Sequence, residues 1–140
     1  MLYGRYQHNI DAKGRMIFPV RLREELGEHA VIFRGLDHCL TVFPAEKWAK
    51  LQEKLDALPM SSGRQIRRFY SANYEVEPDA QGRIVVPPIL RKYADLEKEV
   101  TIIGMMDRVE IWNTAAWEKY NEDMDQNWQE LTDTMDSLGV

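Results

Sequence analysis

The chain contains the same short motif twice. Residues 11–19 read Asp-Ala-Lys-Gly-Arg-Met-Ile-Phe-Pro, and residues 79–87 read Asp-Ala-Gln-Gly-Arg-Ile-Val-Val-Pro. Similarity resumes further on with one inserted residue, where Leu40–Phe43 corresponds to Val109–Trp112. A shared Asp-Ala-X-Gly-Arg, followed by three apolar residues and a proline, is not expected by chance. The sequence therefore predicts two copies of one structural unit.

Each copy of the motif is predicted to form a tight turn that leads into a short strand. Asp and Gly are typical of short hairpin loops, because glycine adopts positive φ without steric cost. The apolar residues after the arginine favour a strand, and the proline ends it because proline cannot donate to a strand ladder. Further strands are expected at residues 6–10, 30–34, 40–43, 100–103 and 109–112, with a short helix at 20–26.

Apolar residues at steps of three and four predict three longer helices. The first covers Ala45–Leu58, and the second runs from a cap at Ser61–Ser62 to about Ala72. The third is predicted as one long amphipathic helix from residue 115 to about Met135, capped by Thr114. Its other face is acidic, which we interpret as a solvated helix face rather than a ligand site.

A unit of about four short strands has too little core to fold alone, so the two copies are expected to pair as a pseudo-dimer. The predicted class is mainly β with added helices (α+β). The predicted segments are a first unit at 1–58, a connecting helix at 59–72, a second unit at 73–117 and an acidic C-terminal helix at 118–140. The apolar stripe of that helix would be free to contact a neighbouring chain.

Composition excludes several classes of protein. With 44% hydrophobic and 29% charged residues, the chain has enough apolar side chain for a core. No run approaches the ~20 apolar residues of a membrane helix, and the N-terminus lacks a signal-peptide pattern, so we expect a cytoplasmic protein. The single cysteine, Cys39, cannot form an internal disulfide and is interpreted as a small buried hydrophobe.

The sequence offers no catalytic constellation. The three histidines form no metal-binding spacing, and one cysteine excludes a cysteine-rich zinc site. Neither a glycine-rich phosphate loop nor a nucleophile elbow is present. Asp11 and Asp79 each lie beside a glycine in a turn. We therefore expect their side chains to hydrogen-bond the backbone of the turn rather than to form a catalytic pair of carboxylates. We therefore expect no enzyme activity, metal, cofactor or small-molecule substrate.

Charge is distributed unevenly along the chain, which carries −5 overall. Residues 1–92 hold 15 Lys/Arg against 11 Asp/Glu, whereas residues 93–140 hold 3 against 12. A basic front and an acidic tail are compatible with one face that meets phosphate.

The turns carry the candidate nucleic-acid contacts. A two-stranded ribbon fits the major groove of DNA, and a guanidinium group can pair with O6 and N7 of guanine. The predicted DNA-binding residues are Lys13, Gly14, Arg15, Gln81, Gly82 and Arg83. Alternatively, Arg15 and Arg83 pair with Asp11 and Asp79 to rigidify the turns; the two roles are compatible, because a pre-set arginine costs less to order on binding. Weaker candidates for phosphate contact, or for bridges to the acidic half, are Arg5, Arg21, Arg23 and Arg91.

The doubled motif closely resembles the MraZ family, and the resemblance covers all but about the last dozen residues. Gly4, Gly35 with Asp37, and the segment 109–112 fit as well. The resemblance implies a double swapped-hairpin barrel like that of AbrB and MazE DNA-binding domains. It also implies a ring-shaped homo-oligomer, associated with the nucleoid, that binds direct repeats in the promoter of the division and cell-wall gene cluster, including its own gene.

Carried over by position, Lys13, Arg15 and Arg83 are the expected readers of bases and phosphates. Gln81 stands where the first loop has Lys13, so the first loop is expected to contribute more. A second hypothesis comes from antitoxins that share this module, in which an acidic C-terminal segment covers a partner protein. The acidic residues after Trp117 favour this hypothesis. The apolar and aromatic residues of the same segment recur at helical spacing, which instead indicates a packed helix.

Overall fold

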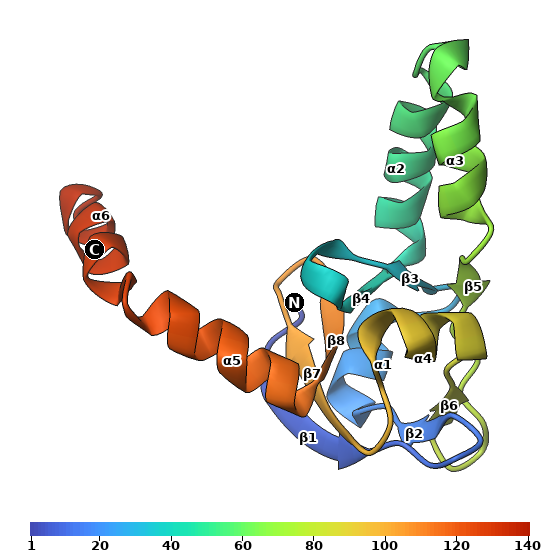
Figure 1. The fold of residues 1–140 in the computed structure, drawn as a ribbon, viewed down its shortest axis with the longest axis horizontal. Coiled ribbons are helices and arrows are strands. Elements are labelled where there is room, and N and C mark those ends of the chain that lie inside the picture. The colour runs from blue at the N-terminus through green and yellow to red at the C-terminus, as the bar shows by residue number, and fades with distance from the viewer.

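The computed structural model describes residues 1–140 and contains two β-sheets with helices around them (Figure 1). The larger sheet is antiparallel and has six strands in the order β1-β7-β8-β4-β3-β5, while β2 and β6 form a separate pair. The strands are β1 Arg5–Asn9, β2 Arg15–Ile17, β3 Val31–Arg34, β4 Leu40–Phe43, β5 Tyr74–Glu75, β6 Arg83–Val85, β7 Glu99–Gly104 and β8 Val109–Asn113. The helices are α1 Val20–Leu26, α2 Ala45–Asp56, α3 Gly63–Tyr70, α4 Pro88–Ala94, α5 Thr114–Asp125 and α6 Trp128–Ser137.

The two copies of the repeat exchange strands. β1 and β2 belong to the first copy, but they pair with β7 and β6 of the second. In return, β5 of the second copy pairs with β3 of the first. This exchange is the swapped arrangement that the resemblance implied, and the predicted α+β class is confirmed. Hydrogen bonding does not close the large sheet into a ring, since β1 and β5 form its two edges.

A pseudo-twofold axis relates the two copies. The register of β2 with β6 centres on Met16 opposite Ile84, and the register of β4 with β8 places Thr41 opposite Glu110. Each of these residue pairs consists of equivalent positions in the repeat. The symmetry is incomplete at β5, which is shorter than its counterpart β1 and is soon followed by Pro78. Proline cannot donate a backbone hydrogen bond, so it limits the strand there.

One hydrophobic core serves both copies. It joins 20 buried residues, with Phe18 and Leu22 contributed by the first copy and Val86 and Leu90 by the second. All four side chains are at most 1% exposed. Because neither copy surrounds its own apolar residues, each copy depends on the other for burial, as expected for units this small.

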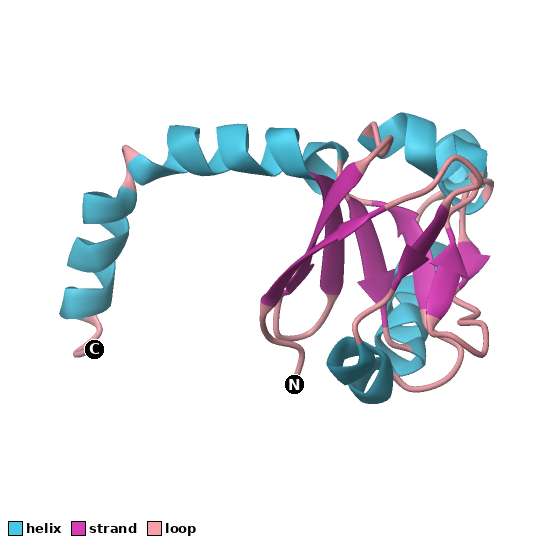
Figure 2. Cartoon of the chain, turned by 90° about the horizontal axis from the view of Figure 1, so that it is seen from below, coloured by secondary structure: helices cyan, strands magenta, loops and turns pink.

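Helices α2 and α5 are also equivalents, and each packs on the outer face of the large sheet through aromatic side chains. Trp48 of α2 lies 5.3 Å from Phe33, and Trp117 of α5 lies 5.2 Å from Trp112, between ring centroids. After α2, the chain turns back so that α3 lies alongside it (Figure 1). After α5, the chain continues outward into α6, so no helix returns on α5 (Figure 2).

The predicted single C-terminal helix is wrong in one respect, because the structure divides it into α5 and α6. Asn127, between them, has φ −105° and ψ 7° and is a poor helix former. The prediction that Thr114 caps this helix is also wrong. Asn113 caps α5 by accepting a hydrogen bond from the Ala116 amide, while Thr114 is buried and hydrogen-bonds Thr101. Ser62 stands at the start of α3, but its side chain makes no capping bond.

Cys39 is buried, as predicted, beside Ile103 and Trp112. Burial disfavours the thiolate and raises the pKa of this thiol to about 12. No helix of the structure is both long enough and apolar enough to traverse a bilayer.

Replacing Gly14 by alanine is expected to destabilise the fold by roughly 1–3 kcal/mol. Gly14 has φ +82°, and a Cβ there would lie 2.6 Å from the carbonyl oxygen of Val86. Gly63 in α3 is the matched control, because a Cβ there meets nothing within 4 Å. Urea unfolding of Gly14→Ala, Gly63→Ala and wild type measures the difference. Equal stability of the two variants would contradict this account of the turn.

Candidate nucleic-acid interface

The two-stranded ribbon of β2 and β6 has one face in the core and one face outside. Met16 and Ile84 point inward and are 1% and 3% exposed. Side chains alternate between the faces of a strand, so their neighbours lie on the outer face. Cross-strand pairing there sets Arg15 opposite Val85 and Ile17 opposite Arg83. The outer face thus carries two arginines and two exposed aliphatic side chains, related by the pseudo-twofold axis.

Both turns before the ribbon have the same hydrogen-bonded conformation. In the first, Asp11 Oδ1 accepts from the amides of Lys13 and Arg15, each at 2.9 Å. In the second, Asp79 Oδ1 accepts from the amides of Gln81 and Arg83 at the same distance. The glycine of each turn has positive φ, +82° at Gly14 and +79° at Gly82. The repeated Asp-Ala-X-Gly-Arg sequence therefore encodes one turn geometry twice.

The same aspartates also orient the arginines. Arg15 Nε donates to Asp11 Oδ2 at 2.7 Å, and Arg83 Nε donates to Asp79 Oδ2 at 2.9 Å. These bonds use only Nε, and no protein acceptor is hydrogen-bonded to the terminal nitrogens of either guanidinium group. The arginine side chains are 38% and 36% exposed. Each arginine is thus fixed through its Nε, and its two terminal nitrogens remain free to donate hydrogen bonds to an external acceptor.

The turns lower the pKa of both aspartates below the ordinary value of 3.8. In each, the largest cause is the hydrogen bond from the backbone amide of the motif arginine, and the bond from its side chain adds to it. Hydrogen bonds to the charged form favour that form. The turn is therefore built around an ionised carboxylate.

Arg23 and Arg91, which occupy equivalent positions, each lie against the turn of the opposite copy. Arg91 Nη1 donates to the carbonyl of Ala12 at 3.2 Å, and its Nε would be 2.9 Å from a Cβ at Gly14. Arg23 donates to the carbonyl of Phe18 at 3.1 Å, and its Nη2 would be 2.8 Å from a Cβ at Gly82. Both arginines are half-buried. The sequence showed that they are equivalent, but only the fold shows that each one touches the other copy's turn.

The remaining candidates are more exposed. Lys13 and Gln81 lie at the tips of the two turns, next to the ribbon arginines. Arg5 begins β1, opposite Ile103, and Arg21 lies in α1, where it lines a small hollow with Met1 and Tyr3. The structure thus groups the six turn residues around one ribbon and leaves Arg5 and Arg21 on other elements.

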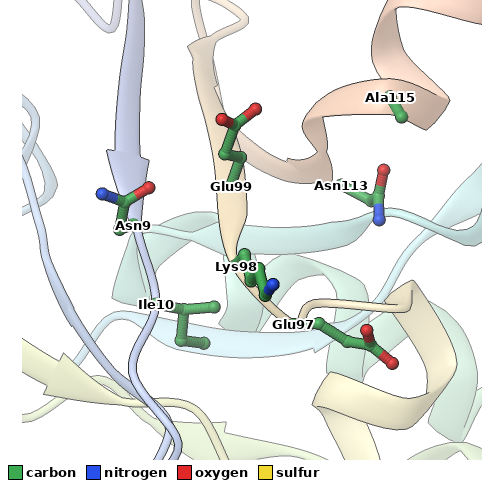
Figure 3. A pocket seen from close by; sticks show the side chains of 7 residues that line it. All are labelled: Asn9, Ile10, Glu97, Lys98, Glu99, Asn113 and Ala115. Carbon is green, nitrogen blue, oxygen red and sulfur yellow. The ribbon is translucent and has the colours of Figure 1, made fainter.

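A polar hollow of about 560 Å³ lies where β1 ends and α5 begins (Figure 3). The carboxylates of Glu97 and Glu99 point in different directions in this hollow (Figure 3). The two carboxylates therefore do not converge on a shared point in the hollow. No cluster of three or more His, Cys, Asp or Glu side chains in the chain is placed to hold a metal ion.

The fold and the ribbon define a two-repeat, strand-exchanged protein with paired arginines on its outer strands. Its sequence matches a family described as "MraZ protein, putative antitoxin-like" over residues 1–67 and again over 69–138. It is 45% identical to the transcriptional regulator MraZ of Halothermothrix orenii over the whole of both chains. It is 50% identical to the protein of that name from Heliobacterium modesticaldum over 96% of both chains. The chain belongs to the MraZ family.

Carboxylate titration is expected to show Asp11 and Asp79 ionising below pH 3.8. Because folding lowers these pKa values, the turns stabilise the folded state above the unfolded pKa and lose this contribution as pH falls through the folded one. In Arg15→Ala, the pKa of Asp11 should rise only partly, since the backbone bond persists. Carbon-13 NMR measures both groups, and Asp79 is the internal control. A complete return of Asp11 to 3.8 would show that the side-chain pair, not the turn, lowers its pKa.

Proposed function

We propose that this protein is a DNA-binding transcriptional regulator that reads base edges in the major groove with the β2–β6 ribbon. The observation that carries the proposal is the pair of arginines, Arg15 and Arg83, oriented by the turns with their terminal nitrogens unused. A guanidinium group of this kind pairs with O6 and N7 of guanine, and the major groove admits a two-stranded ribbon. The two relatives described above are transcriptional regulators by name, which agrees with this function.

The other residues of the ribbon suit the same groove. Ile17 and Val85 are 49% and 62% exposed between the two arginines, where an aliphatic side chain can contact the methyl group of thymine. Lys13 at the tip of the first turn is suited to phosphate, which positions a protein on DNA without reading sequence. Gln81 lacks that charge, so we expect the first turn to bind phosphate more strongly. No catalytic step, cofactor or small-molecule substrate is part of this proposal.

Distribution of charge within the fold supports this orientation on DNA. The acidic helices α5 and α6 leave the sheet on the side away from β2 and β6 (Figure 1). Repulsion from phosphate is weak beyond about 10 Å at moderate salt. A net charge of −5 is thus compatible with a ribbon that meets DNA.

One protomer offers a small reading surface, so we further propose that copies of the chain act together as a ring-shaped homo-oligomer on direct repeats. Binding of several protomers to one DNA adds their contacts through effective concentration. Repeats about 10 bp apart would present the same groove face to successive protomers. The proposed target is the promoter of the division and cell-wall gene cluster, including this protein's own gene, and the proposed location is the cytoplasm at the nucleoid.

Arg15→Ala is expected to lose roughly 1–3 kcal/mol of discrimination between the DNA upstream of its own gene and a scrambled duplex. Fluorescence anisotropy at two salt concentrations measures both affinities. Lys119→Ala removes the same charge from α5, away from the ribbon, and is the matched control. The proposal fails if wild type binds both duplexes equally, or if the two substitutions have equal effects.

Gln81→Lys is expected to strengthen binding, because it gives the second turn the charge that Lys13 gives the first. A new phosphate contact should steepen the slope of log K against log salt by about 0.9. The same substitution should leave the preference for operator over scrambled DNA nearly unchanged, since phosphate contacts carry no base information. An unchanged salt slope would place the second turn away from the phosphates.

A further inference from the structure

Helix α6 presents an apolar stripe that nothing in its own chain covers. Trp128, Leu131, Met135 and Leu138 follow one another at steps of three, four and three, and all four are at least 39% exposed. This spacing aligns them on one side of a helix. An isolated helix of ten residues is only marginally stable in water, so a stripe of this kind indicates a partner surface.

The chain's own surfaces are out of reach of this stripe. Only the first part of α5 packs on the sheet, where Trp117 and Tyr120 contact Trp112. The rest of α5 carries α6 outward, away from both α2 and α3 (Figures 1 and 2). A helix of twelve residues is about 18 Å long, which separates α6 from the sheet.

A surface of the right chemistry lies elsewhere on the molecule. A hollow of about 580 Å³ opens between α2, α3 and the outer face of the sheet. We call it the α2–α3 groove; its apolar lining comprises Phe33, Leu36, Phe43, Leu51, Leu55 and Phe69. Arg34, Arg108 and Glu110 also line it, and Arg108 is paired with Glu110. The groove is therefore mainly apolar, and Arg34 is the basic side chain in its lining without an acidic partner.

The groove and the C-terminal segment carry opposite charge. Residues 45–70, which form α2 and α3, hold six Lys/Arg against three Asp/Glu, whereas residues 114–140 hold one against seven. The three arginines of α3, at 64, 67 and 68, are exposed and make no ion pair within the chain. The acidic residues of α6, at 130, 133 and 136, likewise have no ion-pair partner.

We propose that α6 docks into the α2–α3 groove of a second copy of this chain. Its apolar stripe lies against the aromatic and leucine side chains of the groove, and Glu130 and Asp136, which flank the stripe, face the arginines of α3. The contact joins two different surfaces, so every copy both gives a helix and receives one. Such head-to-tail contacts make a closed ring when the rotation between copies closes. The inference rests on the self-assembly in the proposed function and names the contact that produces it.

Cross-linking in the absence of DNA tests the contact. Two singly substituted chains, Leu131→Cys in α6 and Leu36→Cys at the groove, are mixed and treated with a short bismaleimide. We expect covalent pairs that contain one chain of each kind. Native Cys39 is buried with its pKa raised to about 12, so it gives little background. Val20→Cys, exposed on α1, is the matched control and should give no pair with Leu131→Cys.

The double variant Leu36→Cys/Leu131→Cys distinguishes the possible occupants. A ladder of covalent multimers supports docking between copies. A cross-link within single chains would show that the groove holds the chain's own helix, and it would overturn the proposal. Absence of any cross-link would also overturn the proposal. It would instead favour the hypothesis that the acidic helix binds a different protein, as in an antitoxin.

Charge exchange provides an independent test. Asp136→Arg or Arg68→Asp alone should weaken self-association about tenfold, and the two together in one chain should restore it, as sedimentation velocity measures. A folding defect would not be rescued in this way. Asp136→Arg should still bind a duplex with one repeat like wild type, because the ribbon is unchanged. Failure of DNA binding with normal assembly would reject the proposed function alone, and failure of rescue would reject the docking alone.

Discussion

The structure depends on the exchange of strands between two units that are each too small to bury their own apolar residues. β1 and β2 of the first copy complete the sheets of the second, and β5 of the second pairs with the first. Through this exchange, 20 side chains from both copies share one core. The exchange also forms the β2–β6 ribbon at the pseudo-twofold axis. Formation of the core and formation of the candidate reading surface are thus the same event.

The β2–β6 ribbon contains one strand from each copy, and its inner face is part of the common core. The outer face is therefore held rigid by the core and has the same pseudo-twofold symmetry. Met16 and Ile84 anchor it from below, and the two turn aspartates hold the arginines at Nε. Arg23 and Arg91 lie against the turns of the opposite copies. Each proposed DNA contact is therefore supported by residues from both halves of the chain, which limits the ordering that binding requires.

The two copies differ at the tips of their turns and in the helices that follow their second strand pairs, as well as in the shorter β5. The turns differ in charge at Lys13 and Gln81, next to the proposed DNA contacts. The helices after the second strand pairs differ as well, since α3 turns back on α2 whereas α6 leads away from α5 (Figure 1). The stripe of α6 and the α2–α3 groove are unlike surfaces, and a contact between unlike surfaces is head-to-tail rather than twofold.

By itself, the sequence determined the local features of this protein. The repeat, the two turns, the helix at Val20–Leu26 and the strand at Leu40–Phe43 were all predictable, because glycine, proline and side-chain spacing act within a few residues. The break near Asn127 was missed because the apolar spacing continues through it, and Asn113 rather than Thr114 proved to be the cap. Only the tertiary structure decided which strands pair, which copy's arginine supports which turn, and where the α2–α3 groove opens. Those features join residues such as Arg91 and Ala12, which are far apart in the chain, and no local preference specifies such contacts.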